Sequence, residues 1–313
     1  TLLYYDPIYL EHDTGGHPEG AYRLRSISKH LAETGLDARC ERPEVKAVST
    51  ERLARVHRLE YINEIRDFAA HHGGYIDADT VVSTKSYEAA CKAAGAACGA
   101  VERVVGGDDP HALCLVRPPG HHALRSNAMG FCLFNNAAIA ARVAVAELDL
   151  DRVLIVDWDV HHGNGTQDTF WEDEQVAYLS IHRSPFFPGT GSADEKGSGP
   201  GLGTIVNVPI EFGTPTPKYL DALQSELHAL ADRIRPQLVI ISAGFDAHRL
   251  DPLGSLGLRE RDFAVLTRDV MDVAATHAES RIVSVLEGGY NVDFLPLCVE
   301  AHLRTLNGEA ESG

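Results

Sequence analysis

The sequence predicts an α/β fold, a mainly parallel β-sheet with helices on both faces. Short apolar, β-branched runs alternate along the chain with longer helical patterns, and the connections between them are short. The runs are continuously apolar rather than alternating, which is typical of strands buried on both sides. No Ser/Pro/Gly-rich linker, internal repeat or low-complexity tract interrupts this order, so we expect one domain over residues 1–313.

The expected elements follow directly from these patterns. The expected strands are residues 2–5, 112–116, 153–156, 177–181, 205–208, 238–242 and 282–286. The expected helices are residues 86–105, 135–148, 217–234, 260–277 and 294–306. Residues 186–203, the stretch richest in Gly, Pro and Ser, lie between two expected strands and are interpreted as a long functional loop.

Composition excludes several classes of protein. The 313 residues include 44% hydrophobic residues, too many for a disordered chain. With 28 Lys+Arg against 45 Asp+Glu, the net charge of −17 gives no bulk attraction to nucleic acid or anionic lipid. No run of about 18 apolar residues predicts a membrane span. The N-terminal residues lack a signal-peptide layout and the six cysteines form no CxxC pair, so we expect a reducing, cytoplasmic compartment.

Polar and Gly-rich clusters follow five of the expected strands at the point where each strand ends. The clusters are residues 117–123, 157–166, 182–191, 243–248 and 287–291. In open parallel sheets, ligands bind outside the carboxyl ends of the strands. The five clusters therefore predict one composite site.

Asp157, Asp159 and His161 form the strongest metal signal. Residues two apart in an extended chain project to the same side, so Asp159 and His161 can share one cation, with Asp157 in the same row. Asp246 is the best candidate for a third ligand. Two carboxylates and one imidazole leave an open position for water, as a catalytic Zn²⁺ site requires, although Fe²⁺ or Co²⁺ stays open. A solvated acidic strand end is disfavoured because the flanking Trp158 and a valine indicate burial.

His121 and His122 follow an Arg-Pro-Pro-Gly segment that presents both imidazoles rigidly. A water activated by a metal needs a proton acceptor that can later protonate a leaving amine, and a histidine suits that role. A histidine pair alone is more often structural. Together with the metal row it indicates catalysis.

Tyr290, on a Gly-rich turn, can donate a hydrogen bond to an oxyanion opposite the metal. Considered alone, it is more often a packed residue at a strand end. Gly130-Phe131 and Phe186-Phe187 place aromatic rings on loops, where they often line a slot for an aliphatic chain. These residues predict a narrow apolar pocket.

Together the clusters resemble the histone deacetylase family of zinc amidohydrolases. Their sequences are most similar to those of the class II members and of the bacterial deacetylase-like relatives. The matching segments are DTGGHPE, RPPGHHA, GFCLFNNAAIAA, DWDVHHGNGTQ, SIHRSPFFPGTG, SAGFDAH and LEGGYN, which run in the family's order from Asp13 to Asn291. The resemblance implies a single-domain arginase/deacetylase-like fold and hydrolysis of N-acyl amides.

The resemblance also implies individual roles for the matching residues. The zinc ligands would be Asp159, His161 and Asp246. The general base and acid would be His122, with His121 mainly electrostatic and oriented by Asp157, and Tyr290 would be the transition-state tyrosine. Asn164 would be the partner of His122. Class I members have Asp there, so the neutral partner should leave His122 less basic.

Further positions follow from the same resemblance. A structural K⁺ would be held by Asp157, Asp159, the carbonyl of His161, Ser180 and the carbonyl of Ile181. Phe131 and Phe187 would form the slot walls, Gly130 would accept from the substrate amide, and Asp79 would lie near the rim and bind substrate backbone. Arg23 would belong to an internal acetate channel.

Several functions stay open at this stage. Leu253 stands where one polyamine-specific branch has Glu, which favours acyl-lysine over acetylpolyamine without excluding the polyamine or another small amide. An arginase-like di-manganese centre needs more facing carboxylates than are present. A non-catalytic binding module should have lost a ligand, a histidine or Tyr290, and none is lost. We expect a bacterial enzyme that binds no nucleic acid or membrane; a homo-oligomer stays open.

Overall fold

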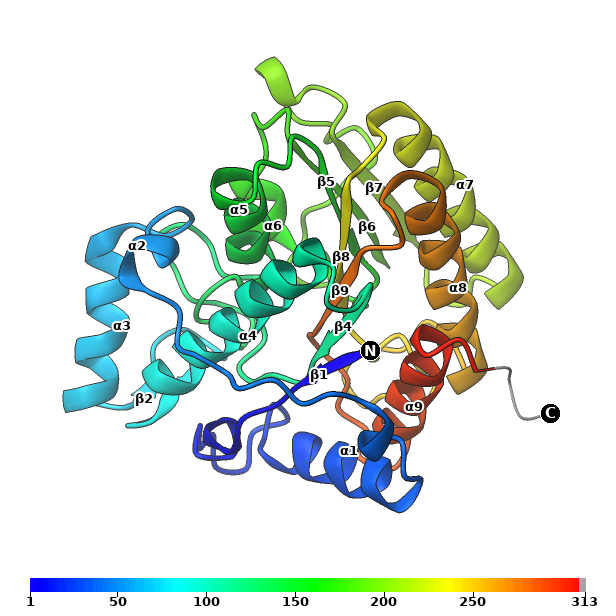
Figure 1. Ribbon diagram of the computed structural model, residues 1–313. Coiled ribbons are helices and arrows are strands. Elements are labelled where there is room, and N and C mark those ends of the chain that lie inside the picture. Colours follow the sequence, from blue (N-terminus) through cyan, green and yellow to red (C-terminus); the bar gives the residue numbers. More distant parts are fainter. Residues whose placement is uncertain (310–313) are drawn as a thin grey trace.

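A seven-stranded sheet lies at the centre of the computed structural model, which describes residues 1–309 (Figure 1). Its strands run in the order β1-β4-β9-β8-β5-β6-β7, and all six pairings are parallel. The strands are β1 (Leu2–Tyr4), β4 (His111–Cys114), β5 (Val153–Asp157), β6 (Val176–Arg183), β7 (Ile205–Ile210), β8 (Leu238–Ala243) and β9 (Ile282–Leu286). The expected α/β class, the strands and their parallel arrangement are confirmed, with strand bounds that differ by at most two residues at either end.

The continuous apolar runs form the middle of this sheet. Every residue of β5, β8 and β9 is buried, as expected for strands covered on both faces. Asp157, the last residue of β5, pairs with Ser180 of β6 and with Ser242 of β8. The register therefore places polar side chains in one row where the strands end.

Helices cover both faces of the sheet (Figure 1). One face carries α4 (Ser86–Gly106) and α5 (Asn136–Glu147), with α2 (Thr50–Leu53) and α3 (Leu59–His71) packed outside them. The other face carries α7 (Thr216–Ile234), α8 (Glu260–His277) and α9 (Leu295–Leu306), with α1 (Tyr22–Glu33) against α9. The smaller elements are α6 (Asn164–Thr169), the hairpin of β2 (Gly74–Tyr75) and β3 (Val81–Val82), and the 3₁₀ turns Pro7–Leu10, Asp37–Arg39 and Gly199–Gly201.

The five expected helices are confirmed. The short helices α2 and α6 were not predicted, and neither were the longer helices α1 and α3. Both longer helices carry an apolar stripe; in α1 it consists of Leu24, Ile27 and Leu31, at helical spacing. Their signal was therefore present in the sequence. Residues 186–203 form the expected loop between β6 and β7, with one 3₁₀ turn inside it.

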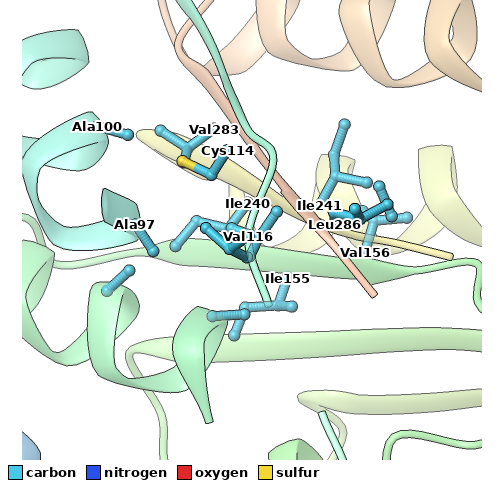
Figure 2. Close-up of a cluster of buried hydrophobic side chains, with 14 of the residues drawn as sticks. Ala97, Ala100, Cys114, Val116, Ile155, Val156, Ile240, Ile241, Val283 and Leu286 are labelled. Carbon is cyan, nitrogen blue, oxygen red and sulfur yellow. The ribbon is translucent and has the colours of Figure 1, made fainter. Parts of the chain in front are cut away.

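Small side chains of α4 let this helix pack closely on the sheet. Figure 2 shows Ala97 and Ala100 in a buried cluster with Cys114 of β4 and Val283 of β9, the two strands that α4 contacts most. All these residues are fully buried, so the helix contributes apolar contact at little entropic cost. The six cysteines are unpaired, and all but Cys40 are buried.

The sheet order explains how the five polar clusters meet. The clusters follow β4, β9, β8, β5 and β6, which are five consecutive strands in space although not in sequence. Because all strands are parallel, their carboxyl ends lie at the same edge. No helix within residues 1–309 is long and apolar enough to cross a membrane.

Candidate metal centre and catalytic pocket

Asp159, His161 and Asp246 converge on one point. One potential ligand atom of each lies within 4.8 Å of the others. His161 Nδ1 is 2.9 Å from Asp159 Oδ1 and 3.2 Å from Asp246 Oδ2. Gly288 permits this approach: a Cβ there would lie 2.2 Å from Asp246 Oδ2, whereas its backbone N–H donates to Asp159 Oδ2 at 2.8 Å.

The electrostatics of this triad fit a bound cation. Although burial opposes its charged form, contacts with Asp159 and Asp246 raise the pKa of His161 to about 10. Burial and the neighbouring Asp159 raise the pKa of Asp246 to about 7. Asp246 Oδ2 accepts no well-aligned hydrogen bond from the described residues. A cation shared by two carboxylates and one imidazole would satisfy these buried groups together.

The two adjacent histidines have different partners. His121 Nδ1 lies 3.0 Å from Asp157 Oδ2, which also accepts from the Tyr178 hydroxyl at 2.9 Å. His122 Nδ1 lies 2.8 Å from Asn164 Oδ1. With Nδ1 of His122 donating to this amide oxygen, its Nε2 carries the lone pair and can accept a proton.

The charges around the two rings separate their pKa values. Against the effect of burial, Asp157 and Asp159 raise the pKa of His121 to about 10. Burial, together with the charges of His121 and His161, lowers the pKa of His122 well below its ordinary value. His122 is thus the neutral member of the pair, as a general base must be.

A cavity of about 180 Å³ opens onto this centre. Its lining residues are Asp79, His122, Gly130, Phe131, His161, Phe187, Leu253 and Tyr290. The rings of Phe131 and Tyr290 meet edge to face at 5.8 Å, and those of His122 and Phe187 do so at 5.2 Å. The structure thus places around one cavity the residues predicted for proton transfer, oxyanion binding and the slot walls.

The wall formed by Gly130 and Phe131 has an unusual backbone. Their φ angles are +55° and +70°, and a Cβ at Gly130 would lie 2.3 Å from the His122 ring. Two neighbours hold it: Asp79 Oδ1 accepts from Gly130 N, and Thr80 Oγ1 accepts from Phe131 N, both at 3.1 Å. Asp79 lies at the cavity as expected, with one oxygen committed to this wall.

Arg23 lies behind the cavity and is fully buried. Its guanidinium is 4.9 Å from the centre of the Tyr290 ring and donates to the carbonyls of Gly289 and Glu287, each at 2.6 Å. It also pairs with Glu19, which accepts from Arg117 as well. Arg23 therefore supports the tyrosine turn from below.

Two of the residues predicted for K⁺, Asp159 and His161, belong to the triad itself, and Asp157 lies next to them. Asp157 and Ser180 are register partners in the β5–β6 ladder, and Asp159 N donates to Asp157 Oδ1 at 3.1 Å. Ser180 Oγ lies 2.9 Å from His182 Nδ1. The carboxylates and the hydroxyl named for this ion are thus brought to one region.

Sequence reasoning missed two buried carboxyl groups, Asp251 and Glu287. Both accept hydrogen bonds from backbone N–H groups of the catalytic turns. Burial, with Asp157 and Asp159 nearby, raises the pKa of Glu287 to about 7 against the opposing effect of His121. The sequence held one signal for these residues, which is an acidic residue beside a Gly-rich turn within an apolar stretch.

The fold and the cavity define a class: an α/β enzyme whose site combines a candidate metal triad with a histidine pair. A model of the family described as "Histone deacetylase domain" matches residues 17–306. A histone deacetylase-like amidohydrolase of Pseudomonas aeruginosa is 38% identical over 94% of this chain and 77% of its own length. A probable deacetylase of Archaeoglobus fulgidus is 37% identical over 94% of this chain and 82% of its own.

A solved structure agrees with these matches. The crystal structure of the HDA15 HD domain superposes with a TM-score of 0.93 at 38% identity, covering 99% of this chain and 88% of that one. The chain therefore belongs to the histone deacetylase family. Its function is that of a deacetylase or amidohydrolase, a hydrolase acting on amides.

Proposed function

We propose that the protein is a zinc-dependent amidohydrolase that removes acetyl or other short acyl groups from N-acylated amines, chiefly acyl-lysine. The observation that carries this proposal is the cavity of about 180 Å³, which is lined by His122, Tyr290 and two phenylalanines beside the carboxylate–imidazole triad. A slot of this kind suits an aliphatic stem that ends in an amide.

Asp159, His161 and Asp246 would hold the zinc, and Asp157, Asp159, His161, Ser180 and Ile181 would hold a structural K⁺. When bound, Zn²⁺ supplies Lewis-acid polarisation of the carbonyl and acidifies water. The K⁺ would offset the density of buried carboxylates around Asp157.

His122 and Tyr290 perform the proton transfer and the charge stabilisation. His122 Nε2 takes a proton from the attacking water while the water oxygen bonds to the acyl carbon. The Tyr290 hydroxyl donates to the oxygen that becomes negative. Protonated His122 then gives its proton to the nitrogen as the C–N bond breaks, which leaves a carboxylate and an amine.

The remaining residues tune these two groups. His121, held by Asp157, contributes positive charge that keeps His122 neutral. Asn164 fixes the tautomer of His122 without adding negative charge. The family resemblance implies that Arg23 takes part in acetate movement, and its burial behind Tyr290 supports this role.

Leu253 at the cavity favours a lysine-type substrate, and an acetylpolyamine or another small amide is the second candidate. The test is kcat/KM of the zinc-loaded enzyme on an acetyl-lysine peptide and on acetylspermidine. We expect a preference for the peptide of about tenfold, or about 1.4 kcal/mol. The reverse preference would assign the polyamine. Activity on neither, with zinc bound, would contradict both the acyl-lysine and the polyamine assignments and would point to a different amide.

The chain is proposed to act as one deacetylase domain over residues 1–313, and the family match to residues 17–306 supports this. The unpaired cysteines support the expected reducing, cytoplasmic compartment.

A further inference from the structure

The turn that carries the histidine pair is held by a side chain from another segment. Gly120 N and His121 N donate to Glu287 Oε2 at 2.7 and 3.2 Å. These are the first backbone donors after Pro118 and Pro119, which have no N–H to offer. Glu287 directly follows the last residue of β9 and stands three residues before Tyr290.

The turn that carries Tyr290 is held in the same manner. Tyr290 N donates to Asp251 Oδ2 at 2.7 Å. The other oxygen of Asp251 accepts from Leu253 N at 2.9 Å and from Gly254 N at 3.0 Å. Asp251 is 8% exposed and lies five residues after Asp246, on the segment that also supplies a candidate metal ligand.

We infer that Glu287 and Asp251 are positioning residues which fix the histidine pair, Tyr290 and the Asp246 segment relative to one another. Glu287 stands on the segment of Tyr290 and accepts from the backbone of the histidine pair. Asp251 stands on the segment of Asp246 and accepts from the backbone of Tyr290. Neither is among the residues that line the cavity in the described part of the chain, so both act through the residues they hold. This inference rests on the proposed function.

The energetics favour a positioning role over a purely stabilising one. Burying a carboxyl group is costly unless its oxygens accept hydrogen bonds. Glu287 is fully buried, and its Oε1 accepts no hydrogen bond from any described residue. The free-energy cost of burying Glu287 is therefore only partly offset by its hydrogen bonds. The turn that it holds, however, carries the proposed general base. A displacement of about 1 Å at such a group can cost about 10²-fold in rate.

The experiment compares truncated and isosteric variants on an acetyl-lysine peptide, with kcat, KM, bound zinc and melting temperature measured together. For Glu287→Ala we expect kcat to fall about 10- to 100-fold, with KM within about threefold and zinc unchanged. Glu287→Gln should stay within about fivefold of wild type, because its amide oxygen can accept both N–H groups. Asp251→Ala should also raise KM, because Leu253 shifts, and Asp251→Asn should restore part of the loss.

Asp262→Ala is the matched control. Asp262 Oδ2 accepts from Arg259 N at 2.7 Å at the start of α8, so its loss should lower the melting temperature and leave kcat unchanged. If Glu287→Ala does not fold, Glu287→Asp replaces it. The shorter side chain keeps the charge, and we expect it to lose kcat because it cannot reach both amides.

Imidazole ¹H–¹⁵N spectra give a readout that needs no turnover. Glu287→Ala should shift the His121 and His122 resonances, and Asp262→Ala should not. Unshifted resonances, an unchanged kcat in Glu287→Ala, or an equal loss in Glu287→Gln would overturn the inference. An inactive, zinc-loaded wild type would instead contradict the proposed function, while the spectra would still decide the positioning role.

Discussion

The floor and the rim of the cavity are built differently. The floor, defined as Asp159, Asp246, His121 and His122, is at most 3% exposed, and each of its side chains has contacts from at least one other segment. The rim, defined as Asp79, Phe187 and Leu253, is half-buried or exposed and stands on loops. We therefore expect substitutions in the floor to affect the reaction itself and substitutions in the rim to affect which substrate is bound.

Within the floor, His121 and His122 show how the neighbouring charges set the role of a buried histidine. Both are 3% exposed, and their ring centres are 4.0 Å apart. Asp157 and Asp159 make the first strongly basic, whereas burial beside the charges of His121 and His161 lowers the pKa of the second well below its ordinary value. Equal burial therefore goes with opposite shifts in pKa when the neighbouring charges differ in sign.

Removing a floor ligand should have the largest effect. Asp246→Ala deletes one carboxylate of the triad, so we expect bound zinc to fall below stoichiometric and kcat/KM to drop by about 10³-fold or more. Metal analysis and turnover measure both effects. Asp221→Ala, which removes an exposed carboxylate on α7, controls for net charge. Full zinc occupancy in Asp246→Ala would remove this residue from the ligand set.

Exchanging the partner of His122 should move the pH profile. In wild type the depressed pKa keeps His122 neutral, and so competent as a base, down to acidic pH. Asn164→Asp places a negative charge at the position that now lies 2.8 Å from Nδ1, which stabilises the protonated ring and raises its pKa. The acid limb of kcat/KM should therefore shift upward by about 1 pH unit or more. An unmoved limb would show that another group controls it.

Changing the rim should have the smallest effect and should alter selectivity rather than chemistry. Leu253→Glu adds a carboxylate at the cavity, so the ratio of kcat/KM for acetylspermidine to that for the peptide should rise about 3- to 10-fold. Leu250→Glu adds the same charge three residues away, at a site 40% exposed that is not part of the lining. Equal changes in the two variants would mean that bulk charge, and not the rim, selects the substrate.

Sequence patterns predicted the strands because burial on both faces leaves continuous apolar runs. They also predicted Asp159 and His161 as neighbours, since a two-residue spacing fixes their relation. The order of the strands is a tertiary property, so spacing alone could not show that β9 and β8 lie between β4 and β5. The contact between Glu287 and Gly120 spans 167 residues and depends on that order, which is why no local pattern showed it.

The most direct test of the account is acetate release from an acetyl-lysine peptide by zinc-loaded wild type and by Tyr290→Phe with the same zinc content. Removing one oxyanion donor should lower kcat about 10²- to 10³-fold without loss of metal. We therefore expect an active wild type and a zinc-replete but nearly inactive variant. A zinc-loaded wild type that releases no acetate, or a Tyr290→Phe enzyme that retains its rate, would contradict the assignment of this cavity, with Tyr290 as the oxyanion donor, as the site of amide hydrolysis.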